Sequence, residues 1–205
     1  MHIKFLEKKY IYYIIYINMN NKLTLITPCT RIHNLPALYE SIEFDKINKW
    51  IIVYDTTVNT CHHSFIHSEQ IIEAYCKSSL NGVVGNTQRN YGLSFVEDDN
   101  YIYFLDDDNI IHPDFWKITE ELETDTIHTF NQYRDEHGHV LLGNRIEMNY
   151  IDTAMYIIHK NMIGDIKWQE DLYQADGKFI SDVYSTGKYK HKYFNKYYCY
   201  YNYLK

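Results

Sequence analysis

Short apolar runs alternate with helical periods along the chain from residue 23 onward. Continuous apolar runs predict buried strands at 23–27, 49–55 and 101–108. Apolar residues at helical spacing predict helices at 34–44, 68–79, 87–96 and 112–123. Asn34 and Ser68 stand at the expected N-caps, and Pro36 lies in the first turn of the first helix. Strands and helices alternating at this spacing predict a parallel, doubly wound sheet.

The pattern changes after about residue 124. Shorter apolar segments predict partly antiparallel strands at 126–134, 140–144, 151–160 and 188–204, with a helix at 175–187. No repeat or linker interrupts this stretch. We therefore expect one α/β domain at 19–205, with a Rossmann-like, mostly parallel sheet and a short antiparallel part. Ligands bind such sheets at the carboxyl ends of the strands, where Asp55 and the aspartates at 106–108 stand.

The first 18 residues form a separate pattern, in which the apolar run 10–18 follows a basic segment. The run is shorter than the roughly 20 apolar residues that span a bilayer, and no small-residue cleavage site follows it. We interpret residues 1–18 as an N-terminal extension ahead of Met19, with an edge strand and an interfacial anchor as the alternatives. We therefore expect a cytoplasmic protein without a transmembrane span.

Charge and cysteine spacing exclude several classes of protein. The formal net charge of -7 argues against a nucleic-acid binder, because such proteins need a basic face to displace counterions. The four cysteines are scattered without a CxxC pair, so neither a zinc ribbon nor a disulfide framework is indicated. We discount the 22 tyrosines as a binding signal, because the composition is typical of an AT-rich coding sequence. The oligomeric state stays open.

Three consecutive aspartates, Asp106, Asp107 and Asp108, follow the apolar run that begins at Tyr101. Side chains alternate in direction along an extended chain, so Asp106 and Asp108 can point one way and Asp107 another. Two converging carboxylates suit a hard divalent cation such as Mg²⁺ or Mn²⁺, whose shell substrate phosphates complete. The alternative is an acidic turn that caps the following helix.

Four motifs carry a resemblance to a known family. In order, LTLITPCTR (23–31), IIVYD (51–55), TQRNYGL (87–93) and YFLDDDN (103–109) resemble the nucleotide-binding half of the GT-A glycosyltransferases, especially the small family 2-like enzymes. The resemblance covers roughly residues 22–183. It implies a nucleotide-binding half at about 22–110 and an acceptor half at about 111–205. It also implies a nucleoside diphosphate sugar donor, with a UDP-sugar favoured, and a hydroxyl acceptor on a glycan, a protein or a small molecule.

The resemblance also implies roles for individual donor-side residues. Thr27, Pro28 and Arg31 would lie along the nucleoside, and Asp55 would accept a hydrogen bond from the base. Arg89 would face the diphosphate or the sugar, because a planar guanidinium can chelate phosphate. Asp106 would touch the ribose or the sugar, with Asp107 grouped beside it, and Asp108 would hold the Mn²⁺ or Mg²⁺ ion. The alternatives are a loop cap for Asp55, a surface ion pair for Arg89 and a solvated charge for Arg31.

The acceptor side needs a carboxylate that takes a proton from the attacking hydroxyl. Asp176 in ADG (175–177) is our first candidate, because it would stand at a helix N-terminus that lowers its pKa; Glu170 and Asp171 are the alternatives. Asp152 would hydrogen-bond sugar or acceptor hydroxyls, unless it only caps a helix or strand. Trp168 is interpreted as a core residue rather than a sugar platform. His191 is a candidate third metal ligand, with a lysine-rich surface strand as the alternative.

Other classes of function remain open from the sequence. A nucleotidyltransferase of similar fold would need a glycine-rich loop after its first strand, and 27–36 contains no glycine. A non-catalytic relative that only binds nucleotide or glycan would not need all of the acids. A haloacid-dehalogenase-like phosphatase would need a later lysine and acidic pair that is not evident. The histidines at 62, 63 and 67 fit no standard zinc spacing.

Overall fold

The computed structural model describes residues 23–58, 68–78, 85–134 and 140–204. The predicted N-terminal extension and the histidines at 62, 63 and 67 lie outside these ranges. Within the described residues, no helix is long and apolar enough to cross a membrane.

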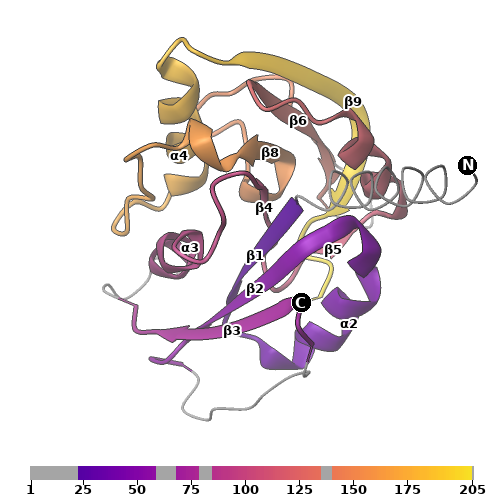
Figure 1. The fold of residues 1–205 in the computed structure, drawn as a ribbon, viewed down its shortest axis with the longest axis vertical. Helices are drawn as coiled ribbons and strands as arrows, with labels where there is room; N and C mark the ends of the chain where they lie inside the picture. Colours follow the sequence, from indigo (N-terminus) through magenta and orange to yellow (C-terminus); the bar gives the residue numbers. More distant parts are fainter. Residues whose placement is uncertain (1–22, 59–67, 79–84, 135–139, 205) are drawn as a thin grey trace, which may run out of the picture.

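One curled sheet organises the described residues, in the strand order β3-β2-β1-β4-β8-β6-β9-β5, with β7 paired to β6 (Figure 1). Its parallel half consists of β1 (Leu23–Cys29), β2 (Ile47–Asp55), β3 (Ile71–Cys76) and β4 (Tyr101–Phe104). Beyond β4 the pairing becomes mixed. The remaining strands are β5 (Ile110–Ile111), β6 (Thr126–Tyr133), β7 (Val140–Leu141), β8 (Tyr156–His159) and β9 (Lys190–Tyr200). The predicted fold class, a Rossmann-like sheet with a shorter antiparallel part, is confirmed.

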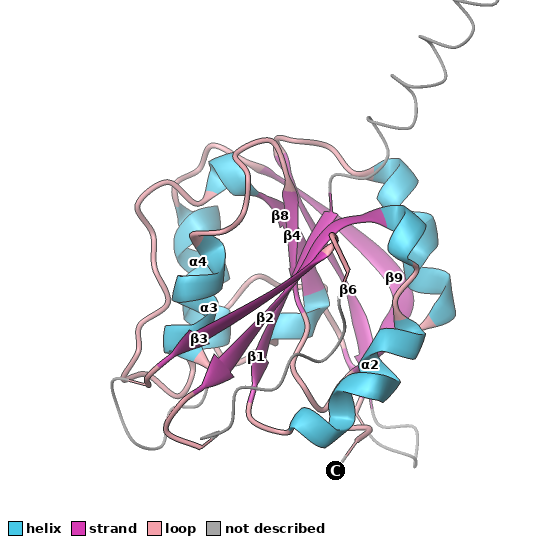
Figure 2. Cartoon of the chain, turned by 60° about the horizontal axis from the view of Figure 1, so that its bottom comes forward, coloured by secondary structure: helices cyan, strands magenta, loops and turns pink. Residues whose placement is uncertain are grey.

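Helices cover both faces of the sheet (Figure 2). One face carries α2 (Leu35–Ser41) and the 3₁₀ helix η3 (Pro113–Glu121), and the other carries α3 (Asn86–Leu93) and α4 (Ala175–Ser185). Short 3₁₀ turns complete the chain at η1 (Ile32–Asn34), η2 (Phe44–Lys46), η4 (Thr153–Met155) and η5 (Lys160–Met162). The strands β1, β2 and β4 between these layers are buried on both faces, which explains why they read as continuous apolar runs.

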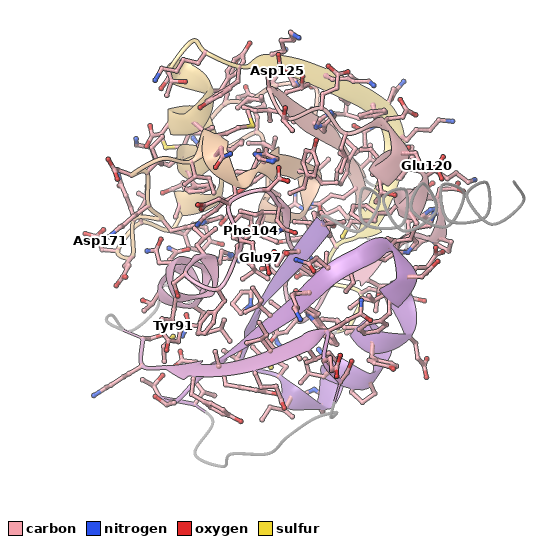
Figure 3. All side chains as sticks on the ribbon, in the orientation of Figure 1. Tyr91, Glu97, Phe104, Glu120, Asp125 and Asp171 are labelled. Atoms are coloured by element: carbon pink, nitrogen blue, oxygen red, sulfur yellow. The ribbon has the colours of Figure 1, made fainter. Side chains whose placement is uncertain are left out.

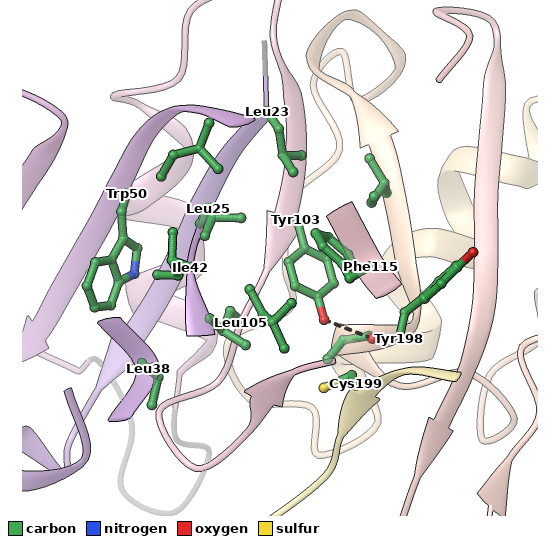
Figure 4. Close-up of a cluster of buried hydrophobic side chains, with 14 of the residues drawn as sticks. Leu23, Leu25, Leu38, Ile42, Trp50, Tyr103, Leu105, Phe115, Tyr198 and Cys199 are labelled. Atoms are coloured by element: carbon green, nitrogen blue, oxygen red, sulfur yellow. Dashed lines mark hydrogen bonds between the residues drawn. The ribbon is translucent and has the colours of Figure 1, made fainter. Parts of the chain in front are cut away.

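The core on the α2 face is built around Tyr103 of β4 (Figure 4). Its ring packs against Phe115 at 4.6 Å between centroids, and its hydroxyl donates to the carbonyl of Ala154 at 3.2 Å. A fully buried phenol needs such a partner, because an unpaired hydroxyl in the core destabilises the fold. Ile102 and Phe104 pack in the cluster on the other face, so β4 is held from both faces and the segment that follows it starts from a fixed position.

The helix predicted at 68–79 is wrong, because this segment contains β3, which pairs in parallel with β2. Ile72 and Ala74 pack on one face of the sheet, while Ile71 and Tyr75 pack on the other. A strand that is covered on both faces lacks the apolar and polar alternation that distinguishes a strand from a helix. Ser68 is consequently no helix cap.

Two further helix predictions need correction in detail. The segment predicted at 112–123 forms the 3₁₀ helix η3 rather than an α-helix. Asn34 precedes α2 as expected, but its side chain does not cap that helix. Its amide instead donates to the carbonyls of Asp107 and Leu204, each at 2.9 Å. Tertiary partners therefore outcompete the local cap.

Candidate active site

A cavity of about 570 Å³ opens where the carboxyl ends of β1 and β4 face the start of α4. Its lining combines four carboxylates with three guanidinium groups, which come from Asp106, Asp108, Asp152, Asp176, Arg31, Arg89 and Arg134. A cluster of side chains of both charges at the carboxyl edge of a sheet is typical of a site for a polar, charged ligand.

Asp107 is separated from its two neighbours as predicted, although β4 ends at Phe104 and Asp107 and Asp108 lie in a turn rather than on a strand. Asp106 and Asp108 line the cavity, whereas Asp107 turns away from it and is 3% exposed. The Asp107 carboxylate accepts from the backbone N–H groups of Thr30 at 2.6 Å and Arg31 at 2.7 Å, and also pairs with the Arg31 guanidinium. Asp107 therefore ties the loop after β1 to the loop after β4. The structure does not bring its side chain to the cavity, where the donor-binding role would place it.

The surroundings of Asp108 disfavour its ionised form. Burial and the neighbouring Asp106 raise its pKa to about 6, although the Arg31 guanidinium lies 3.1 Å from Asp108 Oδ2. Charged oxygens crowded at a cavity wall favour a partner of opposite charge.

Arg89 is the buried cation of the site. It is 5% exposed, pairs with Asp106 at 2.5 Å, donates to Asn86 Oδ1 at 3.1 Å and lies 4.7 Å from the centre of the Trp168 ring. Burial opposes its charge, but Asp106 and Asp176 outweigh that effect and raise the pKa of Arg89. Gly85 (φ +99°) packs on this guanidinium, since a Cβ there would lie 2.8 Å from Arg89 Nη1. Arg89 is thus a fixed, permanently charged wall of the cavity.

Trp168 lies in the core, as the sequence predicts. Its ring stacks on Phe179 of α4 at 4.7 Å, and it is 2% exposed.

Asp152 and Asp176 line the same cavity, with Asp176 in the first turn of α4. Burial raises the pKa of Asp152, and the charges of Asp176 and Asp106 raise it further. Burial also raises the pKa of Asp176, against the opposing charge of Arg89. The expectation that the helix N-terminus lowers the pKa of Asp176 is therefore wrong, because burial and neighbouring carboxylates outweigh the helix dipole.

Three other predicted donor residues lie outside the cavity lining. The Thr27 hydroxyl accepts from the Trp50 indole at 2.9 Å, and both Thr27 and Pro28 are buried. Asp55 ends β2 and accepts from the backbone N–H of Thr57 at 2.8 Å. Burial opposes its ionisation, but hydrogen bonds from Ser78 and Thr57 lower the pKa of Asp55. Its observed contacts are those of a loop cap, the alternative that the sequence left open.

His191 and two candidate bases also lie away from the cavity lining. His191 contacts Thr129 at 2.7 Å near the start of β9, whereas the cavity touches Tyr201, just beyond the end of that strand. Ten residues of strand extend over roughly 30 Å, so His191 does not join Asp106 and Asp108. Asp171 is exposed at the periphery (Figure 3), and Glu170 likewise does not line the cavity.

No group of three or more histidine, cysteine, aspartate or glutamate side chains in the described residues is arranged to hold a metal ion. Asp106 and Asp108 could contribute two oxygen ligands. This fits Mg²⁺ or Mn²⁺ held by one or two carboxylates with substrate phosphates and water, and does not fit an all-protein cage.

Several cavity residues escape sequence analysis. They are Asn86, Arg134, Asn149, Tyr150, Tyr173, Gln174, Tyr201 and Asn202. None stands in a motif with a chemical signature, and the tyrosines are hidden by a composition that contains 22 of them. The ADG motif at 175–177 did point to this side of the cavity, because both its Asp176 and its Gly177 line the cavity.

A scan against protein-family models finds no match to this chain, and a search of the curated proteins finds none either. Solved structures do match. TarS 1–349 from S. aureus superposes with a TM-score of 0.65 at 16% identity, over 88% of this chain and 60% of that one, and its complex with UDP-GlcNAc gives 0.60. The chain therefore spans about three fifths of the length of TarS 1–349.

Nucleotidyltransferases share the architecture. The inositol-1-phosphate CTP transferase from T. maritima superposes with a TM-score of 0.53 at 11% identity, over 88% of this chain and 89% of that one. A putative glucose-1-phosphate thymidylyltransferase from Bacillus anthracis gives 0.53 at 14% identity. At these identities the matches establish the fold, which is the Rossmann-like, GT-A-type α/β fold of these transferases.

Proposed function

We propose that this chain is a metal-dependent glycosyltransferase that moves a sugar from a nucleoside diphosphate donor, with a UDP-sugar favoured, to a hydroxyl acceptor. The observation that supports it best is that Asp176 lines the same cavity as Asp106 and Asp108. Direct displacement needs groups that hold the leaving diphosphate and a separate carboxylate that accepts the proton of the attacking hydroxyl. The fold shared with TarS, solved with UDP-GlcNAc, adds support.

On the donor side, Arg31 and Arg89 would bind the diphosphate. Both guanidinium groups line the cavity, and the buried Arg89 supplies a cation that costs no reorganisation when the ligand binds. Asp108 and Asp106 would hold Mg²⁺ or Mn²⁺ together with the phosphates. A bound cation would neutralise charge that develops on the departing diphosphate.

On the acceptor side, Asp176 would act as the general base. The acceptor oxygen attacks the anomeric carbon, the bond from that carbon to the phosphate oxygen breaks, and its electron pair leaves with the nucleoside diphosphate. The hydroxyl proton passes to Asp176, and the anomeric centre inverts. The raised pKa suits this role, because a base works best when its pKa approaches the working pH. Asp152 would hydrogen-bond the sugar or the acceptor.

A nucleotidyltransferase is the second candidate. It is favoured by the T. maritima transferase, which this fold matches over nearly its full length, whereas TarS 1–349 is matched over 60%. It is disfavoured by the loop after β1, which has no glycine to bring backbone N–H groups against a triphosphate. The two activities release different products, UDP from a sugar donor and pyrophosphate from CTP or TTP. A non-catalytic relative would release neither.

The test is a screen of UDP-, GDP- and CMP-sugars, beginning with UDP-GlcNAc, and of nucleoside triphosphates with sugar phosphates, each with and without Mn²⁺. We expect slow, metal-dependent release of UDP from one donor sugar. Asp176→Asn should lower that rate at least about 100-fold. Asp182→Asn is the matched control, because Asp182 lies on the same helix and pairs with Lys178 rather than lining the cavity. Pyrophosphate release, or full activity of Asp176→Asn, would contradict the proposal.

A further inference from the structure

The turn that follows β9, residues 201–204, is fastened to the loop that carries the aspartates. Its backbone N–H groups at Asn202 and Leu204 donate to Asn109 Oδ1 at 2.8 Å and to the Asp108 carbonyl at 3.0 Å. At the start of the turn, the Tyr201 N–H donates to the carbonyl of Tyr133 at 2.7 Å. Three hydrogen bonds thus fix the backbone of this turn against two other parts of the cavity wall.

Asn34 adds a fourth connection from a different part of the chain. Its side-chain amide donates to the carbonyls of both Asp107 and Leu204. Asn202 stands in the left-handed region (φ +52°), which an asparagine tolerates better than most residues. These hydrogen bonds hold the turn at 201–204 in a fixed position beside the cavity.

Tyr201 projects from this turn into the cavity. Tyr201 is half-buried and lines the cavity together with Asp106, Asp108 and Asp152. A phenol carries an O–H donor and no charge at neutral pH. It can therefore donate a hydrogen bond to an anion, which the three carboxylates would repel.

We propose that the Tyr201 hydroxyl donates a hydrogen bond to the terminal phosphate of the bound nucleoside diphosphate. This rests on the proposed function, which puts phosphate beside Asp106 and Asp108 and the sugar or acceptor beside Asp152. Tyr201 lies near both groups of acids, and the terminal phosphate is the part of the donor that joins nucleotide to sugar. The same contact would stabilise the charge that gathers there as the sugar departs.

The test measures the affinities of UDP and UMP by calorimetry in the presence of Mn²⁺, for the full chain and two variants. Tyr201→Phe removes only the hydroxyl and should weaken UDP binding about tenfold, because a hydrogen bond to a charged group is lost, while UMP binding stays unchanged. Tyr203→Phe is the matched control. Its ring is 67% exposed beside Tyr200 and does not line the cavity, so neither affinity should change.

Three outcomes would overturn the inference. If Tyr201→Phe binds UDP as the unmodified chain does, or if UDP and UMP affinities fall equally, the hydroxyl does not contact the terminal phosphate. If the unmodified chain binds neither nucleotide, the proposed function fails and takes the inference with it. Thermal melting accompanies each measurement; Phe keeps the ring, so the Tm of Tyr201→Phe should match that of the unmodified chain.

Discussion

Replacing Gly177 with alanine should disturb both stability and turnover. A Cβ at this position would lie 2.9 Å from the Cα of Met148, 3.2 Å from the N of Asn149 and 3.2 Å from the O of Glu147. All three atoms belong to backbone, so no side-chain rotation can relieve the overlap. Overpacking of this kind costs about 1–3 kcal/mol, and the better helix propensity of alanine returns about 0.5–1 kcal/mol.

The middle of these ranges leaves a net loss of about 1 kcal/mol, which corresponds to roughly 2–4 °C in Tm for a chain of this size. The overlap pushes the start of α4 away from the turn at 147–149 and moves Asp176 with it. A shift of about 1 Å in a catalytic group can cost about 100-fold in rate, so turnover should fall much more than stability. Melting curves and UDP release from the donor sugar measure the two effects.

Ser181→Ala is the control for Gly177→Ala, because it changes α4 at a residue that does not line the cavity. It should melt at or slightly above the Tm of the unmodified chain and keep its activity. If Gly177→Ala melts normally and turns over at the normal rate, then contact with the turn at 147–149 does not position Asp176.

Three further predictions concern charged or polar groups. Asp107→Asn should lower the free energy of unfolding by about 2–4 kcal/mol, because two backbone N–H groups lose their charged acceptor. Asp108→Asn should instead raise the free energy of unfolding by about 1 kcal/mol, because it removes a charge held close to other carboxylates. Urea unfolding at pH 7 measures both effects. His128 is buried with a pKa of about 4, so at this group the unfolded chain binds more protons between pH 6.5 and 4. The contribution of His128 alone to the free energy of unfolding should fall by about 2 kcal/mol between pH 7 and 5. The pH dependence of stability in His128→Leu should therefore differ from that of the unmodified chain by this amount, and equal pH dependences would refute the reasoning. Arg89→Lys should weaken UDP binding about tenfold by calorimetry, because an ammonium loses the stacking on Trp168 and the planar fork; unchanged affinity would remove Arg89 from the donor site.

Much of the fold is readable from the sequence, because β1, β2 and β4 are buried on both faces and appear as continuous apolar runs. The same property conceals β3, whose two apolar faces imitate a helical period. The predicted split between Asp107 and its neighbours is also observed, but not for the predicted reason, because β4 ends at Phe104 and Asp107 and Asp108 lie in a turn. The strand predicted at 101–108 is therefore too long, and the direction of each aspartate depends on the turn.

The rest of the site depends on contacts between distant residues, which local patterns do not encode. Nothing near Tyr201 in the sequence indicates that the turn after β9 meets the loop at 106–109. The pKa of Asp176 was predicted from its helix alone, and the buried carboxylates that oppose the dipole come from other elements. His191 was placed by its position in the sequence, whereas the length of β9 carries it away from the acids.

The loop at 106–109 is fastened by partners that lie far away along the chain. Asp107 accepts hydrogen bonds from Thr30 and Arg31, which lie 77 and 76 positions earlier in the sequence. Asn109 accepts one from Asn202, 93 positions later, and Asn34 donates one to Leu204, 170 positions later. Contacts of high sequence separation form late, because the chain must close large loops before they stabilise anything. During refolding, the proposed nucleotide binding should therefore return after most of the secondary structure.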